Sequence, residues 1–260
     1  GRFFRSILGS ESVASIQASG YRRIMAQLDS VLAPEWKTAS MNEIMEADIL
    51  LVLGGGAAEL HPVLKPMINR YLKKEGRELI VISSWPDYFY QRATLPITIA
   101  PGLFDAFMDD LRDALAIHGT QSHTGTARYA VDTGRLAKFI SILQGEGNMA
   151  IIVVPDPFGN HDARTLLAAS LHDRACGILP LGGQFNSLGA VAVGDFLSAT
   201  GRDFGDILDD IDSGRIKALY LLGDDPIEGC PDPARVRRAL QKLDLLICQS
   251  PYRSASAELA

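Results

Sequence analysis

The sequence predicts an α/β fold, and three observations support that prediction. Short apolar runs bounded by turn residues recur along the chain, helical patterns of about 10–15 residues separate them, and the runs are continuously apolar rather than alternating. Strands that alternate with helices form crossover units and mostly parallel sheets. Continuously apolar strands indicate sheets with helices on both faces. The predicted strands are 48–53, 78–83, 96–100, 149–154, 176–181, 216–222 and 243–248.

The helices expected between these strands have apolar residues at helical spacing and polar residues on the other face. Two of them start close to a proline, Pro62 and Pro233, a residue that favours the first turn of a helix. The predicted helices are 11–32, 62–75, 103–117, 133–145, 161–174, 203–213 and 233–242.

The chain is long enough for two domains, each with its own core. The stretch 118–134 is polar, rich in glycine and threonine, and without periodicity, which is typical of a linker or long loop. We therefore expect two domains, 1–145 and 146–260. Segments 50–83 and 219–250 share an order of apolar strand, Leu-Gly, loop, proline-started basic helix and second strand. This suggests either two halves of a cleft, each offering one loop, or the ordinary likeness of α/β units.

The composition excludes several kinds of binding partner and metal site. The net charge of -6 argues against nucleic acid, which favours a clustered basic face. No apolar run approaches the roughly 20 residues that span a bilayer, so no direct membrane insertion is expected. The three cysteines (Cys176, Cys230 and Cys248) show no Cys-x-x-Cys spacing, so we expect no disulfide, zinc or iron–sulfur framework and assign no metal ligand. A reducing, cytoplasmic location fits best.

The two ends of the sequence suggest a piece of a longer protein. It starts on Gly1 rather than Met, and it stops at Ala260 inside a plausible helix start without a stop signal. No catalytic set is predicted either, because no G-x-S-x-G occurs and Asp209, Asp210 and Asp212 fit an acidic, exposed helix end.

The first apolar strand runs into three glycines. Gly54–Gly56 and the residues up to Glu59 match the dinucleotide pattern G-x-G-x-x-G except at its last position. Glu59 would place a negative charge beside the phosphates, and the predicted helix starts only at Pro62. The next strand ends in Ser83, with no acidic residue for a ribose hydroxyl. Ordinary NAD binding is therefore not expected, and a P-loop is excluded because no Gly-Lys-Ser/Thr follows.

Two other loops offer polar groups. In 223–226, Gly-Asp-Asp-Pro, two carboxylates would repel a bare phosphate, and the sequence is typical of a turn. In 181–194, glycines such as Gly189 would let the backbone approach a ligand, and Asn186 carries both donor and acceptor atoms. A tight turn would explain these glycines equally well.

The order of these loops resembles the molybdopterin oxidoreductase superfamily, and within it the large iron–sulfur subunit of NADH–quinone oxidoreductase. In that family a strand ends in G-x-N and His-Pro opens the next helix. The matching segments here are Gly54–Gly56 with His61-Pro62, Asn186–Ala190 for N-x-x-G-A, 223–226 for G-x-N-P, and 249–260 for the segment that leads into A-D-V-V-L-P.

The resemblance implies two Rossmann-like domains, the second of which family members complete with an upstream segment, and loops that cradle a molybdopterin guanine dinucleotide. The positions that it assigns to cofactor binding are Gly54, Gly55, Gly56, His61, Ser83, Asn186, Gly189, Gly223, Asp225 and Gln249.

Several of these positions depart from the family. Gly56 and Asp225 stand where the family has Asn, and Ser83 and Gln249 stand where it has Asp. Each lost partner of a buried polar ligand costs about 1–3 kcal/mol, so we expect the site to be vestigial.

The resemblance to the large iron–sulfur subunit implies a structural scaffold without catalytic residues, metal or cofactor of its own. The parent would pass electrons from NADH towards quinone through iron–sulfur clusters held outside this chain. Its partners would be the other subunits of a respiratory NADH dehydrogenase complex, cytoplasmic and peripheral to the inner membrane.

Two alternatives stay open. The chain could belong to an active molybdenum or tungsten enzyme, such as a formate or formylmethanofuran dehydrogenase, that binds molybdopterin guanine dinucleotide. It could also be the central domain of a thiamine-diphosphate enzyme, whose strand–glycine loop resembles 50–58.

Overall fold

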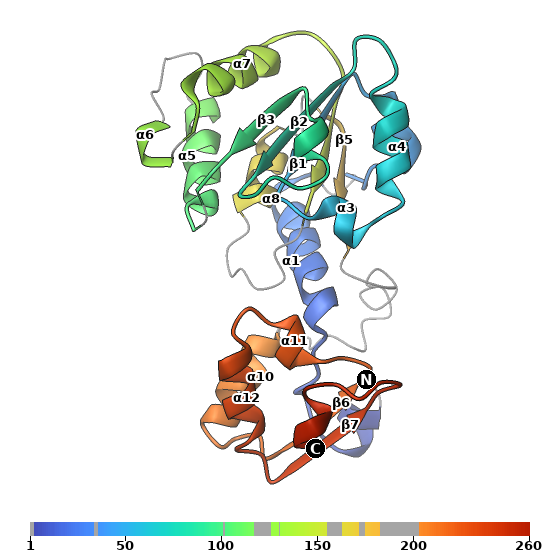
Figure 1. Ribbon diagram of the computed structural model, residues 1–260, viewed down its shortest axis with the longest axis vertical. Coiled ribbons are helices and arrows are strands. Elements are labelled where there is room, and N and C mark those ends of the chain that lie inside the picture. Colours follow the sequence, from blue (N-terminus) through green and yellow to red (C-terminus); the bar gives the residue numbers. More distant parts are fainter. Residues whose placement is uncertain are drawn as a thin grey trace. The chain divides into compact units, whose positions relative to one another are not determined.

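The computed structural model describes residues 3–33, 36–100, 102–116, 126–129, 131–154, 163–171, 175–182 and 203–260. The chain divides into two compact units (Figure 1). We call Tyr21–Gly183 the large unit, and Gly1–Gly20 together with Gln184–Ala260 the small unit. Both are α/β, and every strand pair described is parallel, which confirms the predicted fold class.

The large unit is built on a five-stranded sheet with the order β3-β2-β1-β4-β5. The chain moves from β1 outward to β3 and then returns to β4 on the other side of β1. The topological switch point, where α/β proteins place their ligands, therefore lies between β1 and β4 at the carboxyl ends of the strands. The strands are β1 (Ile49–Leu53), β2 (Glu78–Ser83), β3 (Leu95–Thr98), β4 (Met149–Val153) and β5 (Ala175–Pro180).

The domain boundary that we predicted between 145 and 146 falls inside this sheet. Strand β4 pairs with β1 along its whole length, from Ile49 opposite Met149 to Leu53 opposite Val153. The polar stretch that suggested the boundary connects two helices of the same unit, and one helix, α6 (Thr126–Tyr129), lies within it. The low hydrophobicity of residues 118–134 therefore reflects a connection within one unit and not a boundary between two domains.

Helices cover both faces of the large sheet. Alternate residues of a strand point to opposite faces, so Leu51 and Leu53 belong to one core and Leu50 and Val52 to the other. The first core includes side chains of α1, α5, α7 and α8, and the second includes those of α2, α3 and α4. These helices are α1 (Ile16–Val31), α2 (Met41–Glu46), α3 (Ala57–Leu60), α4 (Leu64–Tyr71), α5 (Phe104–Ala116), α7 (Thr133–Gln144) and α8 (Ala163–Ser170).

The small unit has a two-stranded parallel sheet and one core. That core packs α10 and α12 against one face of the sheet, through residues such as Ile207 and Val236. On the strands themselves, Leu222, Leu245 and Ile247 are 63%, 52% and 45% exposed. The small unit therefore differs from the prediction, because its described residues cover mainly one face. Its elements are η1 (Phe3–Ile7), α10 (Phe204–Asp212), β6 (Ala218–Leu222), α11 (Pro226–Gly229), α12 (Pro233–Leu240), β7 (Leu245–Gln249) and η4 (Ala257–Leu259).

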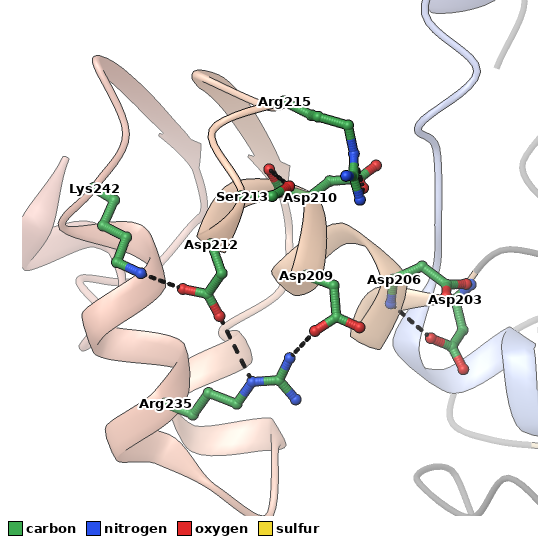
Figure 2. A network of polar contacts seen from close by, with 9 residues as sticks. All are labelled: Asp203, Asp206, Asp209, Asp210, Asp212, Ser213, Arg215, Arg235 and Lys242. Atoms are coloured by element: carbon green, nitrogen blue, oxygen red, sulfur yellow. Dashed lines mark hydrogen bonds and ion pairs between the residues drawn. The ribbon is translucent and has the colours of Figure 1, made fainter.

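Three acidic residues in the second half of α10 are ion-paired (Figure 2). Asp209 pairs with Arg235 of α12, and Asp212 accepts a hydrogen bond from Lys242 at 2.6 Å. Asp210 differs from the exposed helix end that we predicted, because it is buried and accepts a hydrogen bond from Arg215 Nε at 2.7 Å. These carboxylates connect α10 to neighbouring elements.

Across the described part of the chain, no helix is both long enough and apolar enough to span a bilayer.

Candidate functional site

The glycine loop, Gly54–Gly56, connects β1 to α3 at the carboxyl edge of the large sheet. Two of its glycines have positive φ angles, +107° at Gly54 and +84° at Gly56. Residues with a Cβ rarely adopt this region, so the tight turn itself requires glycine at both positions. The Gly54 amide donates to Ile82 O on the neighbouring strand β2, at 2.9 Å.

Gly55, the middle glycine, is required by a neighbouring side chain. A Cβ atom at this position would lie 2.6 Å from Ser83 Oγ and 2.7 Å from Trp85 Cε2. The Trp85 indole, which is 54% exposed, therefore lies directly against the backbone of the loop. In a dinucleotide site, close approach of this kind is made by the pyrophosphate.

The amide of Gly56 is bound by a carboxylate of the same chain. Gly56 N donates to Asp87 Oδ2 at 2.7 Å, and the other carboxylate oxygen, Oδ1, accepts from Tyr90 N at 2.8 Å. Asp87 is only 7% exposed. Sequence analysis missed this residue. Its spacing to Tyr90 is that of a helix cap, which the sequence could have suggested, but nothing local predicts a contact with a loop 31 residues away.

Ser83 lies beside the glycine loop, and it is fully buried. Its hydroxyl donates to Trp85 O at 2.8 Å and accepts from Trp85 N at 3.2 Å. The family that the motifs resemble has an acidic residue here, whereas this serine fixes the turn that carries Trp85.

His61 connects two segments at the same edge of the sheet. Its Nε2 atom lies 2.8 Å from Gly182 O, beyond the end of β5. The imidazole donates in the tautomer that carries hydrogen on Nε2. Asn186 and Gly189, two predicted positions that belong to the small unit, lie outside the described residues.

Three predicted positions of the small unit, Gly223, Asp225 and Gln249, lie at the carboxyl ends of β6 and β7. The Gly223 amide donates to Gln249 O at 2.8 Å, and the Gln249 side chain accepts from the Tyr220 hydroxyl. Asp225 is the N-cap of α11, and its carboxylate accepts from Ile227 N at 3.1 Å and Ala255 N at 2.9 Å.

Asp225 also accepts a hydrogen bond from the Ser256 hydroxyl. Burial alone would raise the pKa of Asp225, but the hydrogen bonds from Ser256 and from the amides of Ile227 and Ala255 lower it below its usual value. The carboxylate is therefore held ionised by its own chain.

The described residues offer no group of three or more His, Cys, Asp or Glu side chains that could hold a metal ion. Two of the cysteines, Cys230 and Cys248, are free thiols. Burial raises the pKa of Cys230 to about 11, with a contribution from Asp224, so this thiol is not prepared for nucleophilic or ligand chemistry.

The structure thus brings Gly54, Gly55, Gly56 and Ser83 together in the large unit, and Gly223, Asp225 and Gln249 together in the small unit. A dinucleotide needs loop amides for its phosphates and an uncovered glycine backbone for close approach. Here the Gly56 amide donates to Asp87, the backbone at Gly55 is covered by Trp85, and Asp225 is engaged with its own chain. These residues do not fit a pterin dinucleotide as they stand.

Comparisons with known proteins identify relatives but no matching family model. One relative is the alpha subunit of an NADPH-Fe(3+) oxidoreductase from Geobacter sulfurreducens, 46% identical over 63 residues, which are 24% of this chain and 8% of that protein. Another is the alpha subunit of F420-dependent formate dehydrogenase 1 from Methanococcus maripaludis, 21% identical across 100% of this chain and 47% of that protein.

Among solved structures, acetylene hydratase from Pelobacter acetylenicus matches with a TM-score of 0.65 at 14% sequence identity. The match covers 100% of this chain and 46% of that chain, and it supports the α/β fold alone. The formate dehydrogenase and the acetylene hydratase are members of the molybdopterin oxidoreductase family that the sequence motifs resemble. The chain spans about half the length of the relatives that it matches from end to end.

Proposed function

We propose that this chain is the molybdopterin-oxidoreductase-like part of a larger electron-transferring subunit, of the kind represented by the large iron–sulfur subunit of NADH–quinone oxidoreductase. In this proposal the part described here is a scaffold that holds no pterin. The parent passes electrons from a reduced nicotinamide through iron–sulfur clusters bound elsewhere in the subunit, and the other subunits of a peripheral respiratory complex are its partners.

The main support for this proposal comes from the contacts of the two loops, Gly54–Gly56 and 223–226. In the large unit the Gly56 amide, which would face a dinucleotide phosphate, donates to Asp87, and in the small unit Asp225, itself a predicted binding position, accepts from amides of its own chain. A fixed negative charge at each loop opposes a pyrophosphate and contributes to the structure without one.

A reduced nicotinamide as electron donor is supported by the relative from Geobacter sulfurreducens. Its name specifies an NADPH-dependent oxidoreductase, and its identity of 46% is about twice that of the formate dehydrogenase, although over a shorter segment.

Elemental analysis of the parent subunit tests the proposal. The native protein, purified from its host, should contain iron and labile sulfide, should reduce a dye with NADH or NADPH, and should contain neither molybdenum nor tungsten in stoichiometric amount. Stoichiometric molybdenum or tungsten, together with a pterin extracted from the same preparation, would overturn the scaffold role.

A formate dehydrogenase is the second candidate function, because a relative of that kind matches the chain from end to end. The same preparation discriminates the two. Formate-dependent dye reduction that depends on molybdenum or tungsten in the growth medium would support this candidate, and nicotinamide-dependent reduction without either metal would support the scaffold.

A further inference from the structure

We infer that the glycine loop of the large unit is a closed structural turn, held by the segment 83–90 of its own chain, and that it takes no dinucleotide. This inference rests on the proposed scaffold function and names the residues responsible for it. We call residues 83–90 the closing segment. Its three contacts with the loop region involve Ser83, Trp85 and Asp87.

The closing segment is firmly anchored beneath its exposed tryptophan. Ser83 and Phe89 are fully buried, and Phe89 belongs to the core that packs α2, α3 and α4 on the sheet. Tyr88 accepts a hydrogen bond from Asn69 of α4 at 2.9 Å, and Arg92 lies over the Tyr88 ring at 3.8 Å. Moving the segment away from the loop would therefore break core packing on both sides of Trp85.

The charge at the loop opposes the ligand that the fold would suggest. A phosphate oxygen bound to Gly56 N would have to take the place of Asp87 Oδ2, which lies 2.7 Å from that nitrogen. If the carboxylate stayed nearby, the two negative charges would repel each other. If it left, a buried carboxylate would lose the amides of Gly56 and Tyr90, which is costly for a charged group.

Each glycine of the loop also has a reason that involves no ligand. Gly54 and Gly56 have positive φ angles, and Gly55 makes room for Ser83 and Trp85. The motif that suggests a nucleotide site is thus explained by contacts within the chain, which is why its match to G-x-G-x-x-G can fail at the last position without consequence for the fold.

A double-mutant cycle tests the packing role of Gly55. The Gly55→Ala variant is made in the wild-type background and in a Ser83→Ala/Trp85→Ala background, and unfolding of the full chain is followed by the fluorescence of Trp36, which is present in every variant. We expect Gly55→Ala to lower the folding equilibrium constant at least about tenfold more in the wild-type background than in the other.

Gly76→Ala is the matched control. Gly76 has a φ of +75°, and no atom lies within 4 Å of the place that a Cβ would take there, so its cost should be the same in both backgrounds. An equal cost of Gly55→Ala in the two backgrounds would overturn the inference, because the glycine would then not be required by the closing segment.

A titration with GDP, the nucleotide half of the expected cofactor, tests the closed loop directly. A Trp36→Phe chain leaves Trp85 as the only tryptophan. We expect its fluorescence to show no saturable change up to millimolar GDP. Saturable quenching that Gly55→Ala abolishes and Asp87→Asn strengthens would overturn the inference, because the nucleotide would then bind at the glycine loop.

The two proposals can fail separately. Molybdenum in the parent subunit, with the Gly55–Trp85 coupling intact and no GDP response, would overturn the scaffold function and leave the closed loop standing. A GDP response in the chain, with no molybdenum or tungsten in the parent, would overturn the closed loop and leave the scaffold function standing.

Discussion

The large and the small unit bury the two faces of their sheets to different extents. In the large unit all five residues of β1 are buried, and a separate core lies on each face of the sheet. In the small unit the described residues build one core, and β7 alternates between exposed and half-buried positions. Strand β1 is apolar throughout and β7 is apolar up to Gln249, so the difference lies mainly in what covers them.

The comparison shows what a continuously apolar strand does and does not predict. Such a strand indicates that burial on both faces would be favourable, because each apolar side chain gains free energy when it leaves water. It does not specify which segment provides the cover. The large unit finds its cover within residues 21–182, whereas Leu222, Leu245 and Ile247 of the small unit remain open to solvent among the described residues.

The largest expected effect comes from the same substitution on the two sheets. Leu51→Ala removes a fully buried side chain from β1 and should destabilise the large unit by about 2–5 kcal/mol. Leu245→Ala, at a side chain that is 52% exposed, should cost less than about 1 kcal/mol. Both tryptophans lie in the large unit, so their fluorescence during denaturation measures the first effect, and hydrogen exchange of the β7 amides measures the second. Equal costs would contradict the comparison.

The small unit should depend on the buried charge of Asp210. Asp210→Ala leaves Arg215 without its carboxylate and should lower the stability of the small unit by about 1–3 kcal/mol. Hydrogen exchange of the α10 and α12 amides would measure this loss. Asp212→Ala on the same helix is the control, because exposed ion pairs contribute only about 0–1 kcal/mol. If Asp212→Ala lowered the stability of the small unit as much as Asp210→Ala, the burial of Asp210 would not explain its contribution.

Acid should loosen the small unit through Asp225. Its pKa is lowered in the folded chain, so its contribution is fully present above the unfolded value of about 3.9 and is lost as pH falls through the folded value. Asp225→Asn should cost about 1 kcal/mol at neutral pH, and below about pH 4 the variant and the wild type should converge. Hydrogen exchange of the α11 amides at several pH values checks this. If the difference in stability between the wild type and Asp225→Asn stayed constant down to pH 3, the effect would come from the shape of the side chain and not from its charge.

The smallest effect concerns salt. The pairs of Asp209 with Arg235 and of Asp212 with Lys242 are exposed and should weaken at high ionic strength. We expect the small unit to lose a few tenths of a kcal/mol between low and high salt. Hydrogen exchange of the α10 and α12 amides that does not change with salt would contradict this assignment.

The secondary structure was largely readable from the sequence. Each of the seven predicted strands overlaps an observed one, and the main helices follow the apolar spacing, because both depend on local patterns. The short helices α2, α3, α6 and α11 were missed, since four to six residues carry too little periodicity. The domain boundary was misplaced because the pairing of β4 with β1 joins segments about 100 residues apart, and no local pattern reports that contact.

The order of the loops could be read from the sequence, but their contacts could not. The glycine loop and Ser83 lie at the same edge of the sheet, since parallel strands bring their carboxyl ends together. The closing partners, Trp85 and Asp87, were not predicted. Their role depends on how the segment after β2 folds back on the loop after β1, and this is fixed by Phe89 in the core and by the turn at Ser83. The burial of Asp210 was not predicted either, because it depends on how the segment after α10 folds back on that helix.

A crystal structure of the parent subunit, purified from its host with whatever cofactors it carries, would test the central claim most directly. The account predicts the Trp85 indole against Gly55 and the Asp87 carboxylate on the Gly56 amide, in a subunit whose iron–sulfur clusters are present. An indole displaced from the loop, with the phosphate of a pterin dinucleotide on the Gly56 amide, would contradict it.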